Sequence, residues 1–187
     1  MDSTNNLTNH FLIAMPGLQD ANFARTVTYV CEHSDQGTMG MVVNRPMNLA
    51  LGEMLEQLDI QPCEPTAREM PVYLGGPVQT DRGFVLHDGG LVWDSTMRIT
   101  KNVSVTTSKD ILEAIAQGRG PENTLVALGY AGWSGGQLDA EMSANAWLSG
   151  PANQEILFHM PPDQRWLAAA RLLGVDMNLL SAEAGHA

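Results

Sequence analysis

Leu125-Val-Ala-Leu-Gly-Tyr-Ala-Gly-Trp-Ser-Gly-Gly-Gln-Leu-Asp-Ala-Glu-Met142 is an apolar run followed by a glycine-rich turn and an amphipathic segment. Residues Leu125–Tyr130 have the composition of a central strand that is buried on both faces. Ser134 and Gln137 match the S-x-x-Q capping box, which places the expected N-cap of the next helix at Ser134. We therefore predict a strand, turn and helix that bring backbone N–H groups to the rim of a sheet.

Length and composition predict a single domain over residues 1–187, with flexible tails at 1–6 and 181–187. The chain is 44% hydrophobic, which is enough for one core. It carries 21 acidic and 10 basic residues, a net charge of −11, and no two basic residues are adjacent. Because strong nucleic-acid binding requires clustered Lys and Arg, direct binding to nucleic acid is disfavoured.

The N-terminal segment predicts a cytoplasmic protein without a membrane partner. No positively charged segment precedes an apolar run, and Phe11–Met15 is too short to cross a bilayer. Cys31 lies in an apolar strand pattern and Cys63 in a proline-rich segment, so we expect one core thiol and one loop thiol.

Alternating and continuous apolar patterns predict about eight short strands and four helices. A polar turn between two β-rich runs predicts an early hairpin. The expected strands are 10–15, 26–33, 38–44, 71–77, 82–88, 97–106, 125–130 and 155–158. The expected helices begin after Asn48, Ser108, Ser134 and Pro161, and residues 61–70 read as a surface loop. These elements favour an α/β fold of the α+β type, a mixed, mostly antiparallel, curved and barrel-like sheet flanked by helices.

Gly132-Trp-Ser-Gly-Gly136 is formally a G-x-S-x-G motif, which in hydrolases presents a nucleophilic serine on a strand-to-helix turn. Ser134 is therefore the alternative catalytic residue of a small serine hydrolase. Its base would have to be His186, near the chain end, or His159, which reverses the usual order of acid and base. The competing interpretation, which we favour, is that Ser134 caps the following helix.

Histidine spacing predicts neither a metal site nor a cofactor. The five histidines are widely separated, and none forms an HxH, HExxH or Cys/His pattern. His87 ends a strand beside Asp88, which could set its tautomer or support chemistry. Hydrogen bonding of His87 to a neighbouring loop is the alternative that we favour.

Turns at strand ends supply the remaining ligand-binding candidates, because such turns collect functional residues. The candidates are Asn44, Arg45, Gly75, Gly76, His87, Trp133, Gly136 and Gln137. Arg45 could clamp an anion, although an exposed or carboxylate-paired arginine is the more common case. The glycine turns could cradle an anion or simply allow close packing. If a site exists, we expect these turns to converge on it.

Several segments together resemble the AlgH/YqgE family of bacterial proteins, from about residue 7 to residue 175. The matching segments are 11–16, 40–46, 72–78, 82–87, 129–133 with 136–138, and 146–148. The resemblance implies a single α/β domain with a bifurcated, barrel-like sheet. Some members bear the name of transcriptional regulator, linked to alginate control, and the family offers no catalytic set to transfer. It also implies that Trp133, Gly136 and Gln137 are better candidates for a shared role than Ser134.

The sequence therefore predicts a regulatory or binding protein that is more plausibly non-enzymatic than catalytic. It would act through a partner protein or a small ligand, and on transcription indirectly, since nothing resembles a helix-turn-helix. We expect a monomer or a weak homo-oligomer.

Overall fold

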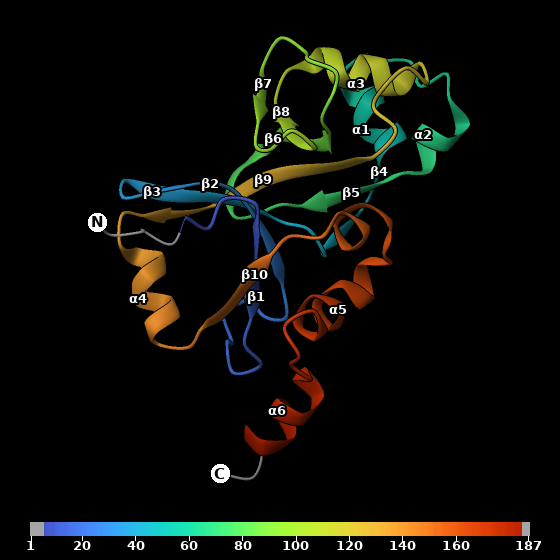
Figure 1. Ribbon diagram of the computed structural model, residues 1–187. Helices are drawn as coiled ribbons and strands as arrows, with labels where there is room; N and C mark the ends of the chain where they lie inside the picture. The colour runs from blue at the N-terminus through green and yellow to red at the C-terminus, as the bar shows by residue number, and fades with distance from the viewer. Residues whose placement is uncertain (1–5, 185–187) are drawn as a thin grey trace.

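Strand β9 (Thr124–Ser134) is the axis of the structure, a computed structural model that describes residues 6–184. The first half of β9 lies between β5 (Pro71–Leu74), which is parallel to it, and β6 (Val78–Asp88), which is antiparallel. Its second half pairs with β3 (Gly37–Val42). The sheet therefore divides along β9 into two lobes, as Figure 1 shows.

The remaining strands extend each lobe through antiparallel pairs. The order is β10-β1-β2-β3-β9-β6-β8-β7, and β4 joins through β5. Their bounds are β1 His10–Ala14, β2 Val27–Ser34, β4 Pro46–Ala50, β7 Thr96–Arg98, β8 Val103–Thr106 and β10 Trp147–Pro151. The expected mixed, mostly antiparallel, curved sheet is confirmed, because β5–β9 is the parallel pair among otherwise antiparallel ones.

Helices cover the lobes and create three apolar clusters. α1 (Leu51–Gln57), α2 (Pro65–Glu69) and α3 (Lys109–Ala116) enclose a cluster with β5, β6 and β9. α4 (Gln137–Ser143) encloses a second against β1, β9 and β10. The largest cluster fills the inside of the curved sheet beneath α5 (Arg165–Arg171). α6 (Met177–Ala184) follows, and short turns of π-helix (Glu155–His159) and 3₁₀-helix (Pro162–Gln164) precede α5.

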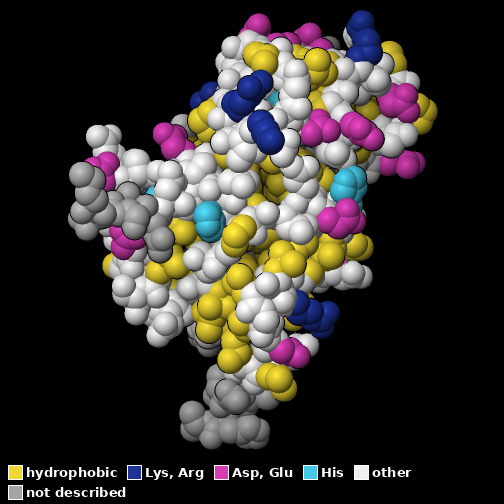
Figure 2. Space-filling model, viewed as in Figure 1, with side chains coloured by type: hydrophobic (Ala, Val, Ile, Leu, Met, Phe, Trp, Pro, Cys, Tyr) yellow, Lys and Arg dark blue, Asp and Glu magenta, His cyan; other side chains and the backbone are white. Residues whose placement is uncertain are grey.

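Apolar side chains remain visible on the lower lobe, over β1, β10 and α5, in Figure 2. Leu172, Leu173 and Leu179 are among the exposed ones. None of the helices in the described residues combines the length and the apolar character that crossing a bilayer requires. The thiol positions agree with expectation: Cys31 is buried and Cys63 is exposed. Residues 1–5 and 185–187 of the expected tails lie outside the described residues, and 181–184 belong to α6.

Three expected elements of the upper lobe were wrong, two because of local hydrogen bonds and one because of strand pairing. Residues 97–106 form the hairpin β7–β8 rather than one strand, since Thr100 Oγ1 accepts the N–H groups of Asn102 and Val103 and fixes a turn. The expected loop 61–70 contains α2, where Glu64 accepts the Thr66 N–H. Asn48 is not an N-cap, because pairing of β4 with β5 keeps the chain extended as far as Ala50.

The C-terminal third differs in a similar way. The expected strand 155–158 is the π-helical turn Glu155–His159, where Asn153 Oδ1 accepts the Ile156 N–H at 3.1 Å. The strand of this region is β10, which pairs with β1 and which the sequence did not reveal. Six α-helices lie in the described residues instead of about four, because α2 and α6 are added.

Candidate functional site

Asn44 and Arg45 follow β3, and both side chains fasten the loop that leads from β1 to β2. Asn44 Oδ1 accepts the Val27 N–H at 2.9 Å, and its Nδ2 donates to the Arg25 carbonyl at 2.9 Å. The Arg45 guanidinium donates to the carbonyl oxygens of Ala21, Asn22 and Ala24 at 2.7 to 2.9 Å. Arg45 is thus held by carbonyl groups, and neither an anion nor a carboxylate is needed to explain its position.

Gly75 and Gly76 follow β5, where the chain leaves its parallel pairing with β9. A Cβ atom at Gly76 would lie 2.1 Å from the carbonyl carbon of Tyr130, and one at Gly75 would lie 2.4 Å from the carbonyl oxygen of Gly129. Gly129 itself has a φ of +78°. Such distances are too short for any side chain, so these glycines permit two backbones to touch. Close packing accounts for them without an anion.

Glu141 of α4 connects the tryptophans to the turn. Its Oε1 accepts the indole N–H of Trp133 at 3.4 Å and that of Trp147 at 3.2 Å. Its Oε2 accepts from Gln137 Nε2 at 3.0 Å. The two indole rings pack edge to face, with centroids 6.0 Å apart, and Phe23 packs against both. This side of the turn is therefore a buried aromatic cluster whose donors share one carboxylate.

Ser134 is the last residue of β9, and its exposed hydroxyl donates to Gln137 Oε1 at 3.3 Å. The Ser134 N–H donates to the same oxygen at 3.0 Å, which is one half of a capping box. The expected N-cap was wrong, because α4 begins at Gln137 after Gly136, whose φ of +80° ends the strand. His186, one of the bases considered, lies outside the described residues. The hydrolase alternative is not supported.

His87 is completely buried and anchors a chain of hydrogen bonds in the upper lobe. Its Nδ1 lies 2.8 Å from the Asp88 carbonyl oxygen, and its Nε2 lies 2.7 Å from Thr106 Oγ1. Since a carbonyl only accepts, Nδ1 carries the proton and Nε2 of the neutral ring accepts from Thr106. Thr106 Oγ1 lies 2.8 Å from Thr96 Oγ1, which accepts the Trp93 N–H at 2.8 Å. Burial lowers the pKa of His87, and its contacts with Asp88 oppose this effect only in part.

The predicted candidates do not converge on one site. Asn44 and Arg45 lie beside Gly75, because the Leu74 N–H donates to the Arg45 carbonyl and Val42 donates to Gly75. His87 pairs with Thr124 at one end of β9, whereas Trp133 lies at the other end. Nine residues of strand separate these positions by about 30 Å. The expectation of a common site was therefore wrong.

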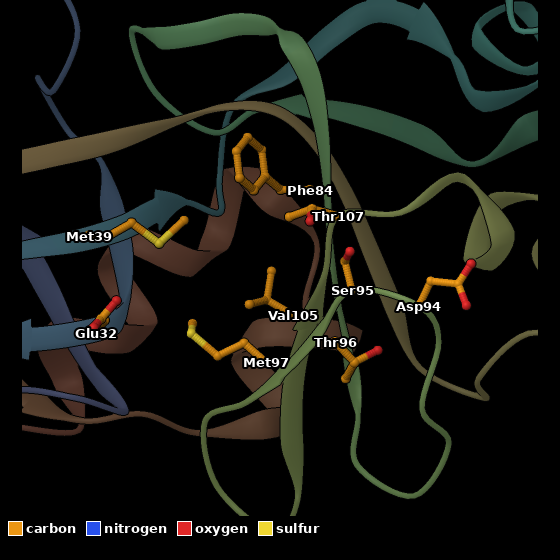
Figure 3. A pocket seen from close by; sticks show the side chains of 9 residues that line it. All are labelled: Glu32, Met39, Phe84, Asp94, Ser95, Thr96, Met97, Val105 and Thr107. Carbon is orange, nitrogen blue, oxygen red and sulfur yellow. The ribbon is translucent and has the colours of Figure 1, made fainter.

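A groove that the sequence did not reveal lies between the two lobes of the sheet. One cavity of about 370 Å³ has Met39 of β3, Phe84 of β6, Met97 of β7 and Val105 of β8 as apolar walls, as Figure 3 shows. A second hollow of about 480 Å³ continues it toward Tyr130, Gly132 and Trp133. Glu32 and Met39 line both hollows, which are therefore adjacent, and we call the two together the groove.

Trp133 is the sequence-predicted candidate that reaches this groove. Strand alternation places Phe84 and Met97 on a face of the sheet, but it cannot show which strands oppose one another. The groove depends on the β2–β3 and β7–β8 hairpins folding toward each other across β9, which is a tertiary contact. Its volume lies in the range of small-molecule sites, and apolar walls with a few polar groups are typical of them.

The charged residues that line the cavity are both acidic, Glu32 and Asp94, and Arg82 contacts two of its other lining residues. Glu32 of β2 lies on the side away from Phe84 and Thr107 in Figure 3. The guanidinium of Arg82 lies 5.7 Å from the centre of the Phe84 ring, and its Nη2 donates to Thr107 Oγ1 at 3.4 Å. The carboxylate of Asp94, which also borders the cavity, points away from it in the same view. Among the residues that the structure describes, no group of three or more His, Cys, Asp or Glu side chains could hold a metal ion.

The fold and the groove define a class of small α+β domains with a sheet that divides along its central strand. The AlgH-like family model matches residues 11–178, and the chain belongs to that family. It is 58% identical, over the full length of both chains, to a UPF0301 protein of Thioalkalivibrio sulfidiphilus. It is 56% identical over 182 residues to the UPF0301 protein AlgH of Pseudomonas aeruginosa, covering 97% of this chain and 96% of that one.

Solved structures agree with the fold. The solution structure of AlgH from Pseudomonas aeruginosa superimposes with a TM-score of 0.81 at 54% identity, covering 100% of this chain and 99% of that one. A crystal structure of a Corynebacterium diphtheriae protein matches with a TM-score of 0.75 at 20% identity, over 97% of this chain and 94% of that one. The second comparison concerns the fold alone.

Proposed function

We propose that this protein is a non-enzymatic regulatory protein that binds a small ligand in the groove between its two lobes. Any effect on transcription would then be indirect, through the ligand or through a partner protein that recognises the ligand-bound form. The observation that carries the proposal is the cavity of about 370 Å³, whose apolar walls come from the four strands β3, β6, β7 and β8.

The groove is favoured over the other candidate residues because those residues already have structural roles. Arg45 holds three carbonyl groups, Gly76 allows two backbones to touch, and Gln137 bonds Ser134 and Glu141. The groove walls, by contrast, are lined by methionine and aromatic side chains. Methionine adapts its shape readily to a bound molecule, which suits a binding surface.

A ligand screen with a matched pair of variants tests the proposal. Met97→Trp places a large side chain in the groove, whereas Met47→Trp makes the same change on β4, at a residue that lines neither hollow. The two methionines have nearly equal exposure, 37% and 36%. A fragment library is added to isotope-labelled protein, and backbone amide shifts are followed by NMR.

We expect hits to perturb the amides of Met39, Met97 and Val105, and to lose affinity in Met97→Trp but not in Met47→Trp. Ligands that perturb amides elsewhere, and whose affinity does not change in Met97→Trp, would refute the groove as the binding site.

A further inference from the structure

A β-bulge in β2 places a carboxylate at the groove. The pairing of β2 with β3 shifts its register between Val30 and Glu32, so Cys31 is the extra residue of the bulge. Glu32 then pairs with Met39, which packs against the largest apolar cluster, and Cys31 belongs to that same cluster. Because cross-strand partners share a face of the sheet, Glu32 lies on the face of its chain neighbour Cys31. The bulge thus turns toward the groove a side chain that strict alternation would direct to the opposite face.

No basic side chain neutralises this carboxylate in the described residues. Glu32 is exposed, and within residues 6–184 its carboxylate has neither a hydrogen bond nor an ion pair. Arg82 lines neither hollow and instead contacts the ring of Phe84 and the hydroxyl of Thr107. Asp94, the other charged residue that lines the cavity, adds a second negative charge, although its carboxylate points away in Figure 3. The lining of the groove is therefore negative.

The other walls of the groove are apolar and aromatic. Phe84 lines the first hollow and Tyr130 the second, and their rings meet edge to face with centroids 5.5 Å apart. The faces of aromatic rings carry partial negative charge and attract organic cations. Met39 and Met97, both drawn in Figure 3, supply polarizable side chains that adapt to a hydrocarbon body. Metal ions bind sets of oxygen, nitrogen or thiolate ligands, which such walls do not supply.

We propose that the groove binds a small organic ammonium ion, with its charged group against Glu32 and its hydrocarbon body over Met39, Met97 and Phe84. This inference rests on the proposed function, since it names the ligand class of the same groove. An apolar acid would meet the Glu32 carboxylate, and the net charge of −11 repels anions while it attracts cations. A neutral apolar molecule would fill the groove but would gain nothing from Glu32.

A series of n-alkylamines of increasing length supplies the probes, together with the alcohol and the carboxylate of each length. Affinities are measured on the full chain by NMR titration at neutral pH, where the amines are protonated. We expect the best amine to bind about fivefold tighter than its alcohol, which corresponds to about 1 kcal/mol, the upper end for an exposed ion pair. The carboxylate should bind most weakly. The preference for the amine should shrink at high ionic strength, because salt screens exposed charges.

Glu32→Gln should weaken the amine about fivefold, to the affinity of the alcohol, and should leave the alcohol unchanged. Arg82→Gln should strengthen the amine, because it removes a positive charge from a neighbour of the groove. Both positions are exposed, so neither change disturbs the core. The same substitutions at exposed sites outside the groove, Glu56→Gln on α1 and Arg171→Gln on α5, serve as controls and should leave all affinities unchanged.

The outcomes separate this inference from the proposed function. If amine and alcohol bind the groove equally, and Met97→Trp blocks both, the ligand class is refuted while the groove stands. An amine preference that persists in Glu32→Gln, or amine-induced shifts away from the groove, would also refute the inference. If no alkyl probe binds the groove, the ammonium ligand is refuted, and the proposed function falls with it only if the fragment screen fails there too.

Discussion

Acidification should destabilise the upper lobe through His87, a fully buried histidine on β6, the strand that pairs with β9. Burial lowers the pKa of the folded ring below its ordinary value of about 6.5. The unfolded chain therefore takes up a proton at a higher pH than the folded protein does. Stability from this residue is complete above about pH 6.5 and is lost as the pH falls toward the folded pKa.

The magnitude follows from the linkage between proton binding and folding. If the folded ring stays neutral throughout, lowering the pH from 7.5 to 5.5 costs about 1.4 kcal/mol, which is an upper limit. In a domain of this size that loss corresponds to about 3 to 5 °C in Tm. The hydrogen-bond chain explains why the ring resists protonation. A proton on Nε2 would face Thr106 Oγ1, and the Thr106 hydroxyl, which donates to the neutral ring, would have to turn its own proton to another acceptor.

His87→Gln isolates the effect, because a glutamine oxygen near the former Nε2 accepts from Thr106 yet does not titrate. Unfolding by urea is followed by circular dichroism for both proteins between pH 5.5 and 7.5. We expect the stability difference between wild type and variant to shrink by up to about 1.4 kcal/mol at the acid end. His10→Gln is the control and should keep the wild-type profile. Parallel loss of stability in wild type and His87→Gln would refute the reasoning.

Three further predictions concern stability. Thr106→Val should lower the free energy of unfolding in urea by about 1 to 3 kcal/mol, because it breaks the hydrogen-bond chain of His87. Thr28→Val should leave that free energy unchanged or raise it, because the buried Thr28 hydroxyl has no hydrogen-bond partner in the described residues. Gly76→Ala should lower the yield of folded protein sharply, as judged by gel filtration, while Gly17→Ala, with nothing within 4 Å, should match wild type. Glu141→Met should lower the free energy of unfolding by about 2 kcal/mol or more, because two buried indole N–H groups lose their acceptor. The same change should alter the tryptophan fluorescence, and an unchanged emission spectrum would contradict the prediction.

Much of the fold could be predicted from the sequence because it depends on local patterns. The apolar run at 125–130 identified the central strand, and the polar turn after His33 identified the β2–β3 hairpin. The apolar pattern predicted the wrong element where short-range hydrogen bonds determine the backbone conformation. Thr100 divides one expected strand into β7 and β8, and Glu64 begins a helix inside an expected loop.

The candidate site was less predictable. Sequence reasoning selected turns, and the fold uses most of them for its own connections, as Asn44 and Arg45 show. The residues that line the groove, such as Met39 and Met97, carry no motif and belong to hairpins that are distant in the chain.

The sequence by itself determined the family, through the motifs that it shares with its members, and the mixed and mostly antiparallel sheet, because apolar periodicity is a local property of the chain. Only the tertiary structure decided that Glu32, Met39 and Met97 line one cavity and that Ser134 is bonded to Gln137. The physical reason is that β9 divides the sheet, and the curvature on either side of it, rather than any spacing along the chain, sets which side chains meet.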